Sequence, residues 1–149
     1  MSGVWATWEV GDAVVLARSI GRPQGRPSLD GLRSAPYIEA MVKSGDIFAD
    51  VPERLADEET KILAANPGAV VERIVSTGQA SPLEFWYDQD WTEWVIVLEG
   101  AARLLIEGEA EARSLGPGDY LELPPRLRHR VEWTDPARPT VWLAVHFKS

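Results

Sequence analysis

Two residues able to carry out chemistry, Glu93 and His129, lie at regular intervals from turn-forming residues. Six residues separate Glu93 from Gly100, and five residues separate Gly118 from Pro124, after which His129 follows. A carboxylate and an imidazole are common agents of proton transfer in enzymes. Both groups also bind divalent metal ions. These two side chains are therefore the first candidates for a functional site.

The elements that must position them are short strands joined by turns. From about residue 69 onward, apolar stretches alternate with turn signals every eight to twelve residues, a pattern typical of an all-β sandwich or barrel. The expected strands cover Val70–Val75, Glu84–Tyr87, Glu93–Leu98, Ala102–Ile106, Glu111–Leu115, Tyr120–Leu123, His129–Trp133 and Val141–Phe147.

One helix is expected before the barrel, over residues 50–65. Asp50 can cap its N-terminus, Pro52 suits the first turn, and acidic residues follow near the positive end of the helix dipole. The sequence Asn66-Pro67-Gly68 is a typical stop signal. We therefore expect a single domain over residues 46–149, with its barrel beginning at about residue 69.

Residues 1–45 have a different character, and we treat them as an N-terminal extension. They include Gly21–Gly31, a stretch rich in glycine, proline and arginine without an apolar period. Met41 is a candidate initiator, in which case residues 1–40 are an over-extension of the reading frame. The alternative is a genuine N-terminal arm.

From about Val70 to Phe147 the chain resembles the cupin superfamily, in particular the small single-domain bacterial cupins. The second half of the first cupin motif, E-x6-G, is matched by Glu93 and Gly100. The second motif, G-x5-P-x-G-x2-H-x3-N, is matched at Gly118, Pro124 and His129. The resemblance implies a jelly-roll barrel, also called a double-stranded β-helix.

The sequence departs from the family pattern at the pair of histidines that normally precedes the glutamate. Depending on the spacing, the pair positions hold Tyr87 and Gln89, or Trp86 and Asp88. In the second motif, arginine replaces the second glycine and tryptophan replaces the asparagine, at positions 126 and 133. The fold implied by the resemblance is therefore well supported by motifs, whereas the usual metal site is incomplete.

The resemblance implies a metal site made of Glu93, His129 and an oxygen donor from Asp88, Gln89 or Asp90. Such a set suits one divalent ion: iron, manganese, zinc or nickel. The alternative is a buried hydrogen-bonded pair of Glu93 and His129 without metal. In that case we expect a raised pKa for Glu93, which would allow it to act as a general acid or base.

Four further residues are candidates for binding a ligand. Trp86 and Tyr87 precede the motif strand and are expected to line the pocket near its rim. Arg128 is a candidate to bind a carboxylate or phosphate of a small ligand. His146 either joins the site or is a half-buried strand residue with one hydrogen bond.

The composition limits the partners of the protein. The net charge of -8 disfavours nucleic-acid binding, and the lack of cysteine excludes disulfides and thiolate chemistry. No apolar run is long enough to span a membrane and no secretory signal is recognisable, so the expected compartment is the cytoplasm. The strand at Glu93 is apolar on both faces, with Trp94, Ile96 and Leu98 on the second face. This face must meet another sheet, the N-terminal arm or a second subunit, and we expect a homodimer through it.

The reaction is open at this point, because one barrel hosts isomerases, dioxygenases, lyases and non-catalytic binding proteins. We expect a small polar molecule to bind in the barrel, with a metal-dependent enzyme as the first interpretation. The alternatives are a metal-free ligand-binding or sensory module and a structural dimer with a vestigial pocket.

Overall fold

The computed structural model describes residues 42–148. The chain divides after Asp46, and the unit that begins at Ile47 contains all the described strands. The predicted extension over residues 1–45 lies outside the described residues except for its last four positions. No helix in residues 42–148 has the length and apolar character needed to cross a membrane.

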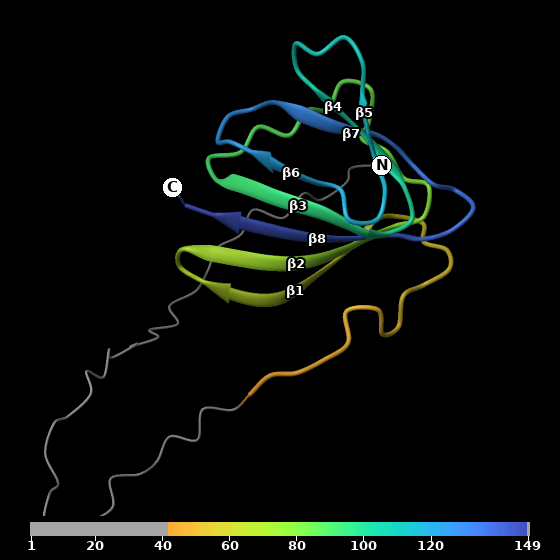
Figure 1. The fold of residues 1–149 in the computed structure, drawn as a ribbon, viewed down its shortest axis with the longest axis vertical. Coiled ribbons are helices and arrows are strands. Elements are labelled where there is room, and N and C mark those ends of the chain that lie inside the picture. The colour runs from red at the N-terminus through yellow and green to blue at the C-terminus, as the bar shows by residue number, and fades with distance from the viewer. Residues whose placement is uncertain (1–41, 149) are drawn as a thin grey trace, which may run out of the picture. The chain divides into compact units, whose positions relative to one another are not determined.

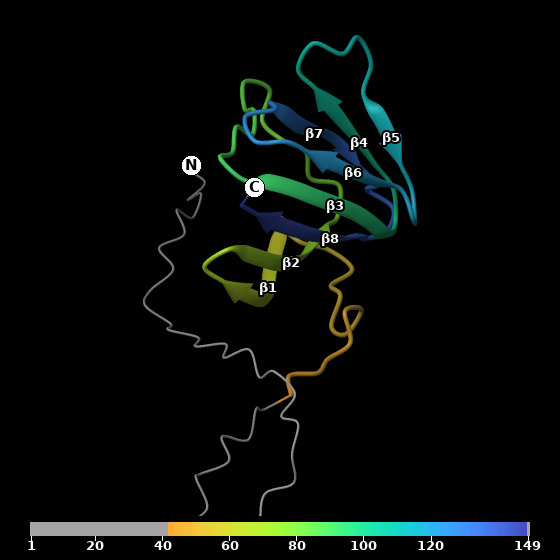
Figure 2. The same ribbon diagram turned by 60° about the vertical axis from the view of Figure 1, so that its left-hand side comes forward.

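The described strands form two antiparallel sheets, as Figures 1 and 2 show. The five-stranded sheet has the order β1-β2-β8-β3-β6, with β1 at Glu59–Asn66, β2 at Ala69–Ser76, β8 at Thr140–Phe147, β3 at Thr92–Glu99 and β6 at Tyr120–Leu123. The three-stranded sheet has the order β5-β4-β7, with β5 at Arg113–Leu115, β4 at Ala102–Ile106 and β7 at His129–Thr134. The all-β jelly-roll fold predicted from the sequence is therefore confirmed.

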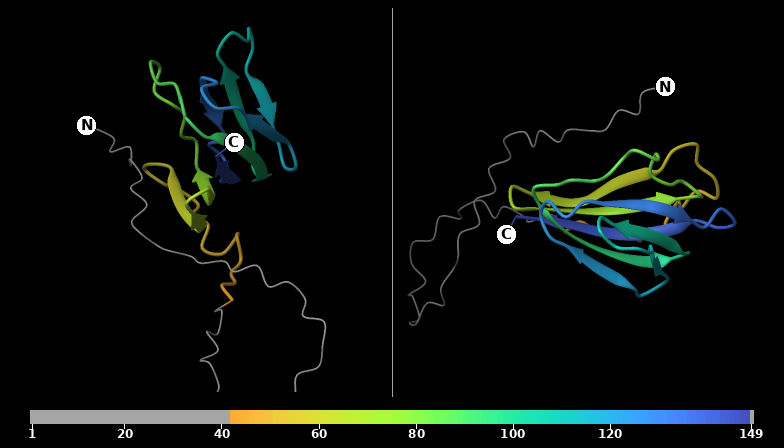
Figure 3. Two further views of the ribbon diagram at one scale, coloured as in Figure 1. Left: turned by 90° about the vertical axis from the view of Figure 1, so that its left-hand side faces the viewer. Right: turned by 90° about the horizontal axis from the view of Figure 1, so that it is seen from above.

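The hydrophobic core lies between the inward faces of the two sheets, whose strands Figure 3 shows from two further directions. Successive residues of a strand point to opposite faces, so Val95 and Val97 of β3 are buried while Trp94 and Ile96 face the other way. Both sheets contribute to the core, which contains Val95, Val97, Ala102, Leu104, Ile106, Leu115, Leu123, Trp142 and Ala144.

The helix predicted over residues 50–65 is wrong. Residues Glu59–Asn66 form strand β1, and the residues before it form turns and irregular chain. Asp50, the expected N-cap, has a positive φ of 55°, whereas an N-cap residue typically has an extended backbone with negative φ. The apolar positions of this segment were too few to give a helix a buried stripe, and pairing with a neighbouring strand outweighed local propensity.

The sequence Asn66-Pro67-Gly68 closes a β-hairpin instead of ending a helix. Strand β1 pairs with β2 from Glu59 opposite Val75 to Asn66 opposite Ala69. The side-chain oxygen of Asn66 accepts hydrogen bonds from the backbone N–H groups of Gly68 at 2.7 Å and Ala69 at 2.9 Å. An asparagine that bonds to the backbone two residues later is a typical turn former, which explains why this stop signal fits a hairpin equally well.

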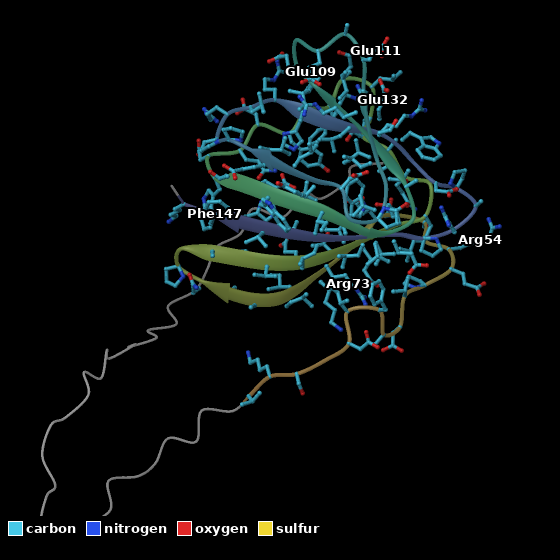
Figure 4. All side chains as sticks on the ribbon, viewed as in Figure 1. Arg54, Arg73, Glu109, Glu111, Glu132 and Phe147 are labelled. Carbon is cyan, nitrogen blue, oxygen red and sulfur yellow. The ribbon has the colours of Figure 1, made fainter. Side chains whose placement is uncertain are left out.

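The segment before β1 is tied to the outer face of the five-stranded sheet through Arg73. Its guanidinium donates hydrogen bonds to the carbonyl of Ala49 at 2.7 Å and to the carboxylate of Glu59 at 2.7 Å. Arg73 is only 3% exposed, and Figure 4 shows it where this segment approaches the sheet. Farther along the same face Trp94 stacks on Tyr120, which is largely exposed. The homodimer expected through this face stays a prediction.

The turn between β3 and β4 requires glycine for two separate reasons. Gly100 has a φ of 85°, a conformation that side chains other than glycine disfavour. A Cβ atom at this position would also lie 2.6 Å from the carbonyl oxygen of Pro139 and the Cα of Thr140. Gly108, in the next turn, has a similar φ of 90° but open space around it.

We expect Gly100→Ala to lower the free energy of unfolding far more than Gly108→Ala. The matched substitution at Gly108 carries only the conformational cost of about 1–2 kcal/mol. Gly100→Ala adds a backbone overlap worth about 1–3 kcal/mol more. Urea denaturation of both variants measures the difference, and equal losses would show that the close approach at Gly100 is unimportant.

Candidate functional site

Glu93 and His129 come from different sheets and meet in the interior of the barrel. Glu93, on β3, shares its face with the core residues Val95 and Val97, while His129 begins β7 on the opposite sheet. Both residues are buried, and His129 Nε2 lies 3.4 Å from Glu93 Oε2. The structure thus brings together the two residues that sequence spacing had singled out.

Two contacts orient the imidazole of His129, and a pair of backbone hydrogen bonds positions the residue. Its Nδ1 lies 2.9 Å from the carbonyl oxygen of Leu127, and because a carbonyl only accepts, Nδ1 carries a proton. The ring stacks on Tyr87, with 5.3 Å between centroids and an interplanar angle of 20°. The backbones of these two residues also exchange hydrogen bonds of 2.8 and 3.2 Å. The remaining nitrogen, Nε2, is the one that faces Glu93.

Gln89 fixes the carboxylate of Glu93 through a hydrogen bond of 3.1 Å from its side-chain nitrogen to Oε2. The loop that carries Gln89 is itself held by Arg126, whose backbone N–H donates to the carbonyl of Gln89 at 2.7 Å. The guanidinium of Arg126 lies 3.1 Å from Asp88 and 3.3 Å from Asp90. Arg126 has a φ of 66° where the family motif has glycine, so this non-glycine residue occupies the strained region that the motif reserves for glycine.

Opposite charges stabilise each other in this pair. Burial disfavours the ionised carboxylate, but the hydrogen bond with His129, the charges of His146 and His129, and the hydrogen bond from Gln89 lower the pKa of Glu93. Burial likewise disfavours the charged ring, but its bonds to Glu93 and Leu127 raise the pKa of His129. The expectation of a raised pKa for Glu93 is therefore wrong, because the imidazolium outweighs the cost of burial.

Tyr87 lies within this buried group through its contact with His129. Burial and the negative charges of Glu58 and Glu93 raise the pKa of Tyr87, so its phenol stays protonated. Its neighbour Trp86 lies elsewhere, next to the guanidinium groups of Arg128 and Arg130 at 5.5 and 5.9 Å from the ring centroid. Of the two aromatic residues expected to line the pocket, only Tyr87 lies beside the Glu93–His129 pair.

Arg128, the other candidate for ligand binding, is partly exposed and forms an ion pair with Glu107. Its side chain therefore has protein partners on the surface of β7. His146 is half-buried with one ionic partner, Glu72, at 3.4 Å. Burial opposes the charged ring, but the hydrogen bond with Glu72 and the charges of Glu93 and Glu72 raise the pKa of His146.

Sequence reasoning missed Glu72. It lies on β2, among the apolar residues of Val70–Val75, and is only 6% exposed. The sequence feature that could have identified Glu72 is a carboxylate in the middle of an apolar strand. The alternation of the strand alone does not say which of its two faces points into the barrel, so the signal could not be used.

The side chains do not fit the metal site implied by the family resemblance. Glu93 and His129 supply two donors, whereas protein sites for zinc and related ions use three or four. Gln89 presents its nitrogen to Glu93, and Asp88 lies with Arg126. In residues 42–148 no three histidine, cysteine, aspartate or glutamate side chains converge on one point. The geometry instead supports an ion pair that can exchange protons.

Comparisons with known proteins agree with this fold. The sequence profile of the family described as "Cupin domain" matches residues 72–146. A candidate mannose-6-phosphate isomerase from Ralstonia eutropha JMP134 is 49% identical, with a TM-score of 0.71, and the match covers 72% of this chain and 100% of that chain. No match was found among curated proteins.

More distant structures share the fold alone. A protein from Thermus thermophilus is 16% identical with a TM-score of 0.60, and the match covers 72% of this chain and 98% of that chain. A cupin superfamily protein from Desulfitobacterium hafniense DCB-2 is 14% identical with a TM-score of 0.55, over 66% and 84% of the two chains. At these identities the likeness carries no information on substrate.

We expect His129 to titrate above 6.5, the ordinary value for histidine, in the folded protein. A raised folded pKa contributes stability that is complete below pH 6.5 and is lost as the pH rises through the folded pKa. The lowered pKa of Glu93 has the opposite effect, because its contribution is present above pH 4.5 and is lost as the pH falls.

The measurement is a proton NMR titration, which is simple because the chain has only two histidines. His146→Gln assigns the two signals. Urea denaturation over the same pH range should show that His129→Gln removes part of the loss of stability above pH 6.5. A His129 signal that titrates at or below this value would contradict the ion pair.

We also expect the untagged protein to purify without a stoichiometric metal ion, because two donors hold a divalent ion weakly. Chelation with EDTA should leave the melting temperature unchanged. Elemental analysis of the wild type, Glu93→Ala and His129→Ala is the measurement. About one metal per chain that is lost in both variants would restore the metal site implied by the resemblance.

Proposed function

The chain belongs to the cupin family, whose members share a barrel but not a reaction, and from its own site we propose an acid–base enzyme of the isomerase type. In this proposal a small polar molecule binds in the barrel, and Glu93 and His129 move a proton within it. The observation that carries the proposal is the buried Glu93–His129 ion pair. Gln89 holds the carboxylate, and the carbonyl of Leu127 holds the imidazole.

The pair has the charges that such chemistry requires. The lowered pKa of Glu93 favours its carboxylate form, which can accept a proton, and the raised pKa of His129 favours its imidazolium form, which can donate one. Their separation of 3.4 Å is longer than the 2.7–2.9 Å typical of a strong charge-assisted hydrogen bond. In this proposal both atoms exchange this weak mutual contact for contacts with the ligand.

The proposed reaction is the isomerisation of a hydroxy-carbonyl compound. Glu93 takes the proton from the carbon next to the carbonyl group, and His129 Nε2 gives a proton to the carbonyl oxygen, which forms an enediol. In the second half of the reaction, the hydroxyl on the carbon that lost its proton gives a proton to His129. Glu93 then delivers its proton to the former carbonyl carbon. Atoms and electrons balance, and the enzyme is restored without an oxidant or reductant.

The relative described as a candidate mannose-6-phosphate isomerase supports an isomerase acting on a sugar. The charges near this site favour an unphosphorylated one. Arg126 is engaged by Asp88 and Asp90, while Arg128 pairs with Glu107. Arg130 donates to backbone carbonyls. Among residues 42–148, each of these neighbouring arginines has a protein partner, so we propose an uncharged hydroxy-carbonyl substrate.

The test is deuterium uptake from D2O into free aldoses, such as D-mannose, and into mannose 6-phosphate. We expect uptake into the free sugar, lowered about 100-fold or more by Glu93→Gln and by His129→Gln, the usual contribution of a general acid or base. Glu109→Gln, in an exposed ion pair with Arg113, is the matched control and should leave the rate unchanged.

Other outcomes decide between functions. Binding of sugar without deuterium uptake would replace the enzyme by a metal-free binding module. Uptake into the phosphorylated sugar alone would contradict the argument from charge. Neither binding nor uptake with any aldose would overturn the proposed function.

A further inference from the structure

A second carboxylate–imidazole pair lies in the same barrel. Glu72 of β2 is 6% exposed, and its Oε2 lies 3.4 Å from Nε2 of His146 on β8. This separation equals that of Glu93 and His129. Neither member of the second pair has a part in the reaction described above.

The strand register places this pair on the inner face of the barrel. His146 follows Trp142 and Ala144 at alternate positions of β8, and both of these are core residues. Glu72 and Ser76 lie four residues apart on β2 and so share one face of that strand. Ser76 accepts a hydrogen bond from the indole nitrogen of Trp142, which places this face toward the core. Both side chains therefore point toward the interior that contains Glu93 and His129.

The two pairs are contiguous, because His146 lies directly opposite Glu93 in the pairing of β3 with β8. Residues directly opposite in antiparallel strands have side chains about 4.5–5.5 Å apart at Cβ. The order Glu72, His146, Glu93, His129 alternates negative and positive groups across β2, β8, β3 and β7. A ligand that contacts Glu93 is thus within reach of His146.

His146 has a free hydrogen-bonding position. Its Nε2 faces Glu72, whereas no partner is present for Nδ1 within the described part of the chain. Its side chain is 20% exposed, compared with 6% for His129, so solvent or a ligand can reach the ring. A buried ion pair costs desolvation energy that an apolar pair would avoid, so packing alone does not account for this one.

We propose that Glu72 and His146 are the second half of the ligand site, in which Nδ1 of His146 donates a hydrogen bond to a second ligand oxygen. This inference rests on the proposed function. His129 serves the carbonyl oxygen, and His146 binds the hydroxyl on the neighbouring carbon. Glu72 is a positioning residue, because it acts by orienting the ring and keeping it charged. The site therefore selects compounds with oxygens on adjacent carbons.

The first measurement is the NMR signal of His146 while D-mannose is added to the wild-type protein. We expect this signal to shift on saturation, and we expect His146→Gln to weaken sugar binding about tenfold or more, the usual effect of losing a hydrogen bond from a charged group. Glu72→Gln keeps the shape of the side chain but should lower the pKa of His146 and weaken binding. Glu109→Gln should change neither quantity.

The kinetic measurement separates this inference from the proposed function. If the wild type takes up deuterium, His146→Gln and Glu72→Gln should raise KM more than they lower kcat, whereas a purely structural role would lower stability without this split. If the wild type binds sugar without uptake, loss of binding in both variants still supports the second half of the site. An unmoved His146 signal at saturating sugar, or unchanged sugar affinity in His146→Gln, would overturn the inference.

Discussion

The carboxylate of Glu93, buried in the interior of a barrel, is the constraint on which the rest of the site depends. An isolated ionised carboxylate is costly to bury, so it must have a partner of opposite charge. His129 supplies that partner from the opposite sheet, at 3.4 Å. The carbonyl of Leu127 and the ring of Tyr87 orient the imidazole, and Gln89 holds the carboxylate. The contacts around the pair all serve to keep two opposite charges at fixed places in an apolar interior.

The family position that usually holds metal-binding histidines is used differently in this chain. Tyr87 and Gln89 occupy one of the two possible alignments of that histidine pair, and both contact the Glu93–His129 pair. An amide that donates a hydrogen bond stabilises a carboxylate, whereas a second imidazole would have added a metal donor. The clamp from Arg126 to the loop of Gln89 keeps this arrangement in place at the cost of a positive φ. In place of two metal-donor imidazoles, this position therefore supplies groups that orient the Glu93–His129 pair.

The same arrangement continues from the inner face of the five-stranded sheet to the opposite sheet, where His129 lies. Charges alternate in sign from Glu72 to His146, Glu93 and His129, so each group lowers the cost of burying the next. The polar end of the barrel is separate from the apolar core around Val97 and Trp142. This division allows the core to stabilise the fold independently of the charged groups.

Sequence alone was sufficient for the class of fold, most strands and the central pair. The strands from β2 onward follow apolar alternation and turn residues, which are local properties, and the cupin motifs mark Glu93 and His129 directly. The predicted strand at Glu84–Tyr87 is reduced to one bridge between Tyr87 and His129, because this segment bonds to β7 only at scattered points. Local signals also misassigned Glu59–Asn66, where a typical helix stop closes a hairpin.

Only the tertiary structure showed that the pKa of Glu93 is lowered and that Glu72 lies near the candidate site. Both depend on which groups other strands bring nearby, and a single strand does not encode its neighbours or its inward face. Which of Trp86 and Tyr87 faces the Glu93–His129 pair has the same origin. Adjacent residues of an extended chain point to opposite sides, and only the bridge from Tyr87 to His129 decides which side is inward. The sequence by itself determined the barrel and its central Glu93–His129 pair, because the motif residues and the apolar alternation are local features of the chain. The tertiary structure decided the charges and the extent of the site, because these arise from contacts between strands distant in sequence.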